Sequence, residues 1–139
     1  MQNNSLIYST GRYALTAIML LIVDLLWLST GGKYAVRMTE KIQGQPVNFR
    51  YTSALVVYLA LAYMVLQTTS YQQAFLYGLT TYMVYDFTNY ALLKDYYLKF
   101  AIADSLWGGI LFLIVYYIIH NFIIDSKKID TSIIHPASI

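Results

Sequence analysis

Residues 13–29 read YALTAIMLLIVDLLWLS, an apolar run in which Asp24 is the one charged residue. A helix that crosses a bilayer needs about 20 mostly apolar residues, with a range of roughly 17–25. The whole chain follows this pattern, since 58% of its 139 residues are hydrophobic and only 12% are charged. Soluble domains are about 25% charged, so this composition argues against a soluble domain, and it excludes a disordered chain.

Several other classes of protein are excluded by what the sequence lacks. A chain without cysteine has no disulfide scaffold, no thiolate zinc site and no cysteine nucleophile. Its formal net charge of +2 is too small for electrostatic binding of nucleic acid, so no nucleic-acid partner is expected. The first residues, MQNNS, lack the basic residues of a signal peptide, so we expect the first apolar helix to be retained.

Charged residues divide the rest of the chain into further apolar stretches. The stretch 51–93 contains one charge, Asp86, and is interrupted by the polar segment QTTSYQQ at residues 67–73. The stretch 100–124 also contains one charge, Asp104. We predict a single integral membrane domain over residues 1–139, an all-α bundle of four transmembrane helices at residues 13–29, 53–68, 74–92 and 100–124, with a tail at residues 125–139.

The segment of residues 30–50 is the one sizeable loop between these helices. Gly31 and Gly32 are expected to stop the first helix, because glycine readily adopts the backbone conformation that ends helices. Apolar residues then recur at helical spacing, at Tyr34, Ala35, Met38 and Ile42. This pattern predicts a short amphipathic helix on the membrane surface, and an irregular polar loop is an equally weighted alternative.

Basic residues are distributed unevenly between the two sides of such a bundle. Four spans place both termini on one side, which carries Arg12, Lys127 and Lys128. The other side carries six basic residues in the loops of residues 30–50 and 93–99, namely Lys33, Arg37, Lys41, Arg50, Lys94 and Lys99. Because basic loops usually stay in the cytoplasm, we predict that these loops are cytoplasmic and that both termini lie on the opposite side.

Three acidic residues remain inside the predicted spans, and the alternating direction of the helices brings them to one depth. Asp24 lies five residues before the end of the first span, and Asp86 lies six residues before the end of the third. Asp104 lies four residues after the start of the fourth span. At a rise of 1.5 Å per residue, all three carboxyl groups fall roughly 6–9 Å inside the same membrane face.

A repeated motif and a polar stripe surround these acids. Residues 24–27 (DLLW) and 104–107 (DSLW) share the pattern Asp-x-Leu-Trp, which places each acid beside its own tryptophan on one helix face. Gly108 and Gly109 follow the second motif and allow close approach of a neighbouring helix. The expected polar intramembrane cluster comprises Asp24, Trp27, Tyr82, Asp86, Asn89, Asp104 and Trp107.

An ionisable residue within a span is costly and usually faces the interior of the bundle, so the cluster needs an explanation. Two interpretations carry about equal weight. A small hydrophilic pocket would bind a proton, a polar headgroup or a hard cation such as Mg²⁺ or Ca²⁺. In the structural interpretation, protonated or water-bridged acids and Asn89 hold the helices together, with Trp27 and Trp107 as interfacial anchors. No transition-metal site is expected, because His120 lies near the far end of the fourth helix and His135 lies in the tail.

Three segments carry a resemblance to a known family: DLLWL at residues 24–28, YDFTNYA at residues 85–91 and DSLWGG at residues 104–109. In this order they resemble an uncharacterised family of small four-span integral membrane proteins. It is a domain-of-unknown-function family found in bacteria, algae and large DNA viruses. The resemblance extends over about residues 13–119, and it implies the fold and the membrane location without implying an activity.

The sequence contains no hydrolase elbow, metalloprotease motif or phosphate-binding glycine-rich loop, so an enzyme is the less favoured class. We predict a structural or interaction component of a membrane assembly, such as a virion inner membrane. Its expected partners are the bilayer, further copies of the chain, or other membrane or capsid proteins. The first alternative is a small transporter or proton- or cation-binding protein that uses Asp24, Asp86 and Asp104. The second is a lipid-modifying membrane enzyme. No cofactor is expected, apart from the hard cation that the acids could hold.

Overall fold

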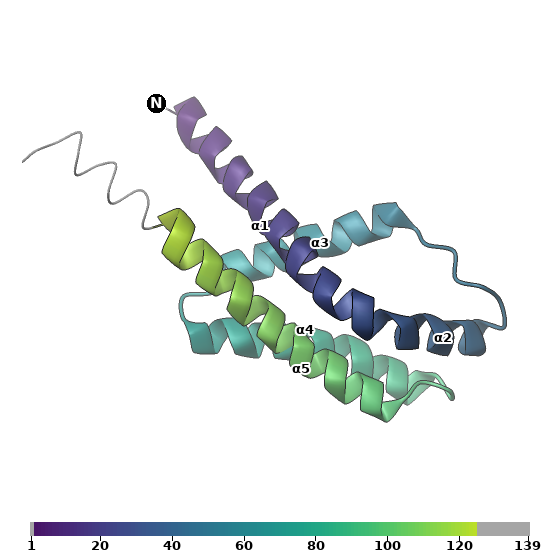
Figure 1. The fold of residues 1–139 in the computed structure, drawn as a ribbon. Coiled ribbons are helices and arrows are strands. Elements are labelled where there is room, and N and C mark those ends of the chain that lie inside the picture. Colours follow the sequence, from purple (N-terminus) through teal and green to yellow (C-terminus); the bar gives the residue numbers. More distant parts are fainter. Residues whose placement is uncertain (1, 125–139) are drawn as a thin grey trace, which may run out of the picture.

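The computed structural model describes residues 2–124, and every regular element in this range is a helix (Figure 1). The helices are α1 (Gln2–Thr30), α2 (Gly32–Gln43), α3 (Tyr51–Leu66), α4 (Tyr71–Leu92) and α5 (Leu98–Ile118). A π-helical segment, Ile119–Ile124, continues α5. The prediction of an all-α chain is therefore confirmed for the described residues, whereas the predicted tail at residues 125–139 lies outside them.

Two of these helices contain stretches that are long and apolar enough to cross a membrane. They are Thr10–Thr30 in α1 and Leu98–Phe122 in α5 and its π-helical extension. α3 is apolar but shorter, and α4 is long but rich in tyrosine and threonine. Length and composition thus identify two spans within the described residues, and the count of four spans stays a prediction.

The four longest helices alternate in direction (Figure 1). The C-terminus of α1, all of α2 and the turn between α4 and α5 lie at one end of the molecule, which we call the α2 end. The N-terminus of α1, the turn between α3 and α4 and the C-terminus of α5 lie at the opposite end. This arrangement brings the last third of α1 beside the second half of α4 and the start of α5.

The first and last helices extend beyond their predicted spans. α1 begins at Gln2 instead of residue 13, and α5 begins at Leu98 instead of residue 100. The physical reason is that hydropathy marks where a helix would meet lipid, whereas backbone hydrogen bonds and caps decide where it ends.

The turn between α3 and α4 also differs from its prediction. α3 occupies residues 51–66 instead of 53–68, and the Thr68 hydroxyl donates to the Val65 carbonyl oxygen at 2.6 Å, just after the helix ends. α4 begins at Tyr71 instead of residue 74, because the Ser70 side chain caps it by accepting a hydrogen bond from the Gln73 backbone N–H at 3.2 Å. The polar residues 71–73 therefore belong to the helix and not to the connecting turn.

Gly31 connects α1 to α2 in a way that the sequence did not indicate. Its backbone stays in the right-handed helical region, and the N–H groups of Tyr34 and Ala35 donate to its carbonyl oxygen. α1 does end at Thr30, directly before Gly31, as predicted, but the expected helix-ending conformation of the glycine is wrong. A Cβ atom here would lie 2.7 Å from the Trp27 ring, so packing requires this glycine. The left-handed glycine that ends a helix is Gly44, with φ of 69°, after α2.

α2 is a regular helix, so the irregular-loop alternative for this segment is excluded. Its Met38 side chain is buried with Tyr96 and Ala101, beneath the turn between α4 and α5. This contact packs α2 against the turn between α4 and α5. The placement of α2 on a membrane surface stays a prediction.

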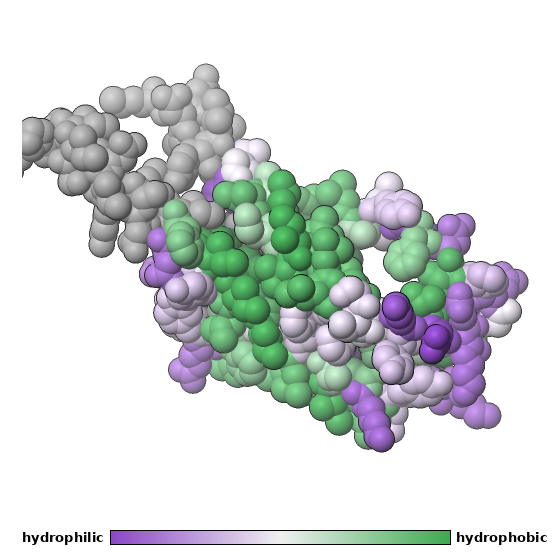
Figure 2. All heavy atoms as spheres, viewed as in Figure 1, coloured by the Kyte–Doolittle hydropathy of each residue, from purple (hydrophilic) through white to green (hydrophobic). Residues whose placement is uncertain are grey.

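The main core lies where α1, α3 and α5 meet. Leu20, Ala62, Leu111, Phe112 and Val115 are completely buried there. The outer surface is also apolar, and Figure 2 shows hydrophobic side chains covering the middle of the molecule while hydrophilic ones gather at the α2 end. Such a surface is typical of helices whose outer faces meet lipid.

α4 and α5 form the closest helix pair in the molecule. A Cβ atom on Gly78 would lie 2.1 Å from the Gly108 carbonyl oxygen, and one on Gly108 would lie 2.4 Å from the Tyr82 ring. A Cβ atom on Gly109 would lie 2.7 Å from the Phe75 ring. The close helix approach expected at Gly108 and Gly109 is therefore confirmed.

Candidate functional site

Asp24 joins three helices through its carboxylate. It lies in α1 and is 7% exposed. One oxygen accepts a hydrogen bond from the Tyr58 hydroxyl of α3 at 2.8 Å, and the other accepts from the Trp107 Nε1–H of α5 at 2.7 Å. Both donors come from other helices, so this side chain ties α1 to α3 and to α5 at one point.

Asp86 is completely buried and is held by the segment that follows α4. Its Oδ1 accepts a hydrogen bond from the Tyr96 hydroxyl at 2.6 Å. Burial, and then the neighbouring carboxylate, raises the pKa of Tyr96, so this hydroxyl keeps its proton and donates it. Ser105 lies 3.4 Å from the Asp86 Oδ2, but its single hydroxyl hydrogen has a shorter acceptor, the Ala101 carbonyl oxygen at 2.6 Å.

Asp104 completes the group of acids, which we call the acid cluster (Asp24, Asp86 and Asp104). Its carboxyl group contacts the Trp27 indole and the Asp86 carboxyl group, and it is 9% exposed. Adjacent negative charges repel each other strongly in a site without bulk water, so the neighbouring carboxyl groups of this cluster influence one another. Asp104 therefore lies between Trp27 of α1 and Asp86 of α4.

The two Asp-x-Leu-Trp motifs are joined crosswise. Trp107 from the second motif donates to Asp24 of the first, and Trp27 from the first contacts Asp104 of the second. The two indole rings stack at a centroid distance of 5.8 Å with an interplanar angle of 13°. Helical spacing alone paired each acid with its own tryptophan, whereas the packed helices exchange the partners and leave both rings half-buried.

The other two residues of the predicted cluster, Tyr82 and Asn89, have different relations to the acids. Tyr82 packs on Gly108 and lies close enough to all three acids to interact with them electrostatically. Asn89 is half-buried on the same helix, and no hydrogen bond joins its side chain to an acid within the described residues. Tyr82 thus lies with the acid cluster, and Asn89 is not part of its hydrogen-bond network.

A cavity of about 240 Å³ opens between the acid cluster and α2. Asp24, Asp104 and Tyr82 line it on one side, and Met38 and Thr39 of α2 line it on the other. We call this space the acid cavity. Among residues 2–124, no group of three or more histidine, aspartate or glutamate side chains is placed to hold a metal ion.

An apolar groove of about 910 Å³ adjoins the acid cavity. The two spaces share the side chains of Trp27, Tyr96 and Phe100, and Lys99 lies at the edge of the groove. We call it the aromatic groove. The acid cavity, with the carboxyl groups of Asp24 and Asp104 at its wall, therefore continues into an apolar space lined by rings.

The basic residues predicted for one side all lie at the α2 end, and all six are exposed. Lys41 forms the one ion pair within the described residues, with Asp95 at 2.8 Å. Their hydrogen bond raises the pKa of Lys41 and lowers that of Asp95. Lys33, Arg37, Arg50, Lys94 and Lys99 reach none of the three acids through an ion pair in the part of the chain that the structure describes.

Residues 10–119 match the family described as Predicted membrane protein (DUF2177). The chain belongs to this family. The matched range contains all three segments on which the resemblance rested, so that resemblance is confirmed. The chain is accordingly a helical membrane protein. No curated protein and no solved structure matches it.

The sequence did not identify the two tyrosines that donate hydrogen bonds to the acids in this DUF2177 protein. Tyr58 and Tyr96 are the main donors to Asp24 and Asp86, and Ser105 lies beside Asp86. Tyr58 could have been suspected as a donor, because its hydroxyl group lies in an otherwise apolar stretch of sequence. Tyr96 carried none, because tyrosines are expected at membrane edges in any case.

Proposed function

We propose that this DUF2177 protein spans the membrane four times, with the α2 end in the cytoplasm and both termini on the opposite side. Two spans follow from the length and apolarity of α1 and α5, and the alternating helix directions support two more. α4, with 22 residues, is about 33 Å long, which matches the roughly 30 Å of hydrocarbon in a bilayer. α3 has 16 residues and is about 24 Å long, a mismatch that local thinning of the bilayer accommodates.

Single-cysteine labelling tests this topology cleanly, because the chain has no cysteine of its own. Gln45→Cys lies in the loop after α2, and Gln72→Cys lies at the start of α4; both positions are exposed. We expect a membrane-impermeant maleimide to label Gln72→Cys in intact cells and Gln45→Cys only after permeabilisation. Labelling of both positions from one side would rule out the crossing of α3.

We propose that the protein is a structural component of a membrane assembly, in which the acid cluster locks the helices together. The observation that supports this proposal most directly is that both carboxylate oxygens of Asp24 accept hydrogen bonds from other helices. Asp86 is similarly engaged by Tyr96. The five basic side chains at the α2 end that form no ion pair within the described residues then supply a surface for a partner with acidic groups.

One set of variants separates this role from transport. Full-length Asp24→Asn and Asp104→Asn proteins are compared with the wild type, and Asp95→Asn, which removes an exposed acid outside the cluster, is the matched control. We expect both cluster variants to unfold at lower denaturant concentration in detergent micelles. Cation and proton flux into vesicles should equal that of protein-free vesicles for every protein. Wild-type flux that Asp104→Asn abolishes without loss of stability would replace the structural role with transport.

A second candidate function is the binding of an amphiphile, and one specific observation favours it. The acid cavity continues into the aromatic groove, so a headgroup with amine or hydroxyl donors would reach Asp104 while its apolar chain occupies the groove. Mass spectrometry of lipids that copurify with the same variants distinguishes the two roles. A species retained by the wild type and by Asp95→Asn but lost from Asp104→Asn would favour amphiphile binding.

A further inference from the structure

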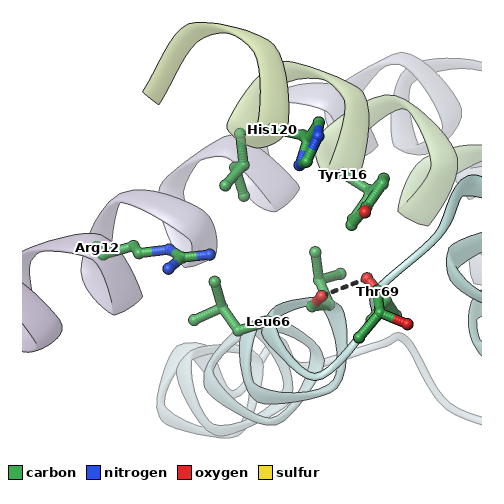
Figure 3. Close-up of a pocket in the computed structure, with 8 residues that line it drawn as sticks. Arg12, Leu66, Thr69, Tyr116 and His120 are labelled. Carbon is green, nitrogen blue, oxygen red and sulfur yellow. Dashed lines mark hydrogen bonds between the residues drawn. The ribbon is translucent and has the colours of Figure 1, made fainter. Parts of the chain in front are cut away.

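A second cavity, distant from the acid cluster, lies at the opposite end of the bundle. It has a volume of about 190 Å³, more than ten times the roughly 10–15 Å³ that a single water molecule requires. Arg12 of α1, Thr68 and Thr69 after α3, and Tyr116 and His120 near the end of α5 line it. Figure 3 shows the Arg12 side chain extending toward this space from one helix and His120 bordering it from another. We call it the Arg12 cavity.

Arg12 has no partner for its charge within the described residues. Its Nε atom is buried and makes no hydrogen bond, and no acid forms an ion pair with it there. The nearest acid along α1, Asp24, is twelve residues away, which corresponds to about 18 Å. The other described acids, which are Glu40, Asp86, Asp95 and Asp104, belong to the α2 end or to the acid cluster.

The neighbouring side chains give this cavity further hydrogen-bonding capacity. The His120 ring stacks on Tyr116 at a centroid distance of 5.5 Å and an interplanar angle of 15°, which fixes the ring beside the cavity. A guanidinium group offers a planar fork of N–H donors that matches the oxygens of a phosphate, and imidazole adds another donor. Arg12 is half-buried, but its buried Nε–H lacks an acceptor within the described residues, and an oxygen of an anion in the cavity would supply one.

We propose that the Arg12 cavity binds the phosphate group of an anionic ligand. This inference is independent of the structural role proposed for the acid cluster. Arg12 lies near the start of the apolar stretch Thr10–Thr30 in α1, and His120 lies near the end of the apolar stretch Leu98–Phe122. In a bilayer, this is the level of the lipid phosphates. A phospholipid headgroup and a free phosphate would present the same chemistry to the cavity.

The test compares full-length wild type, Arg12→Gln and His120→Phe in a neutral detergent. Lys33→Gln, which removes an exposed basic residue at the α2 end, is the matched control. Binding of dioleoylphosphatidic acid, of dioleoylglycerol and of inorganic phosphate is measured by native mass spectrometry and by the shift in melting temperature. Circular dichroism checks that each variant keeps its helical content.

We expect Arg12→Gln to bind phosphatidic acid at least about tenfold more weakly than the wild type, the effect of losing a hydrogen bond to a charged group. His120→Phe keeps the stacked ring and should weaken binding about threefold, while Lys33→Gln should bind as the wild type does. If Arg12→Gln fails to fold, the His120→Phe comparison decides the question. Competition by inorganic phosphate identifies a free anion as sufficient, and its absence identifies a lipid headgroup; either result supports the proposal.

Two results would overturn it. The first is equal binding of phosphatidic acid and dioleoylglycerol by the wild type, which would mean that the phosphate is not recognised. The second concerns Asp125, which lies outside the described residues. If Asp125→Asn strengthens the binding of phosphatidic acid more than about tenfold, a carboxylate of this chain is the normal counterion of Arg12.

Discussion

Replacing Gly78 with alanine is expected to force α4 away from α5. The new Cβ atom would lie 2.1 Å from the Gly108 carbonyl oxygen and 2.8 Å from the Phe112 Cβ. Backbone atoms cannot rotate out of the way, so the whole helix pair must shift. We expect the free energy of unfolding to fall by about 3 kcal/mol, at the upper end of the range for overpacked cores. Denaturant titration in micelles, followed by circular dichroism, measures this loss.

Gly11→Ala is the matched control for this substitution. A Cβ atom on Gly11 would meet nothing within 4 Å, and the residue lies inside α1. Alanine is favoured over glycine in a helix interior by roughly 1 kcal/mol, so this variant should be as stable as the wild type or more stable. Equal stabilities for Gly78→Ala and Gly11→Ala would contradict the close helix approach that the structure places at Gly78.

The second large effect is expected at Asp24. Alanine at this position leaves the Tyr58 hydroxyl and the Trp107 indole N–H without their acceptor. An unsatisfied donor costs about 1–3 kcal/mol when buried, and both donors here are half-buried, so the lower end of this range applies to each. Asp24→Ala should therefore lower the free energy of unfolding by about 2–3 kcal/mol. Trp107→Phe removes one donor while keeping an aromatic ring. A double-mutant cycle with Asp24→Ala should give a coupling energy of roughly 1–2 kcal/mol, near the maximum measured for hydrogen bonds between membrane helices.

Thr69→Ala supplies the comparison for this cycle. Thr69 lies in the turn between α3 and α4 at the opposite end of the bundle, where its hydroxyl donates to Gln73. Its effect should add to that of Asp24→Ala within about 0.5 kcal/mol, as for distant sites. A coupling energy between Asp24 and Trp107 of no more than about 0.5 kcal/mol would show that their hydrogen bond does not hold the helices together.

The sequence was enough to predict which acids form the acid cluster. Asp24, Asp86 and Asp104 lie at similar distances from the ends of their apolar runs, and counting residues from those ends predicted that they lie close together. The repeated Asp-x-Leu-Trp motif drew attention to the correct two helices. Counting could not assign hydrogen-bond partners, because partners depend on how each helix is rotated about its axis.

Gly31 illustrates the same limit at the level of the backbone. Glycine is common where helices end, so sequence patterns favoured a helix-ending conformation there. The residue instead keeps a right-handed helical backbone, and glycine is needed because the Trp27 ring occupies the space that a side chain would fill. Trp27 in turn stacks on Trp107, which lies 80 residues further along the chain. No local pattern contains that constraint.

The sequence by itself indicated the membrane environment and the helical class, and it predicted that the three acids lie close together. These properties follow from hydropathy and helical rise, which act locally along the chain. Only the tertiary structure decided that Tyr58 and Trp107 bind Asp24, that the two motifs exchange partners, and that Arg12 borders a cavity with His120. Each of these results depends on contacts between residues more than 30 positions apart, and such contacts arise from the packing of whole helices.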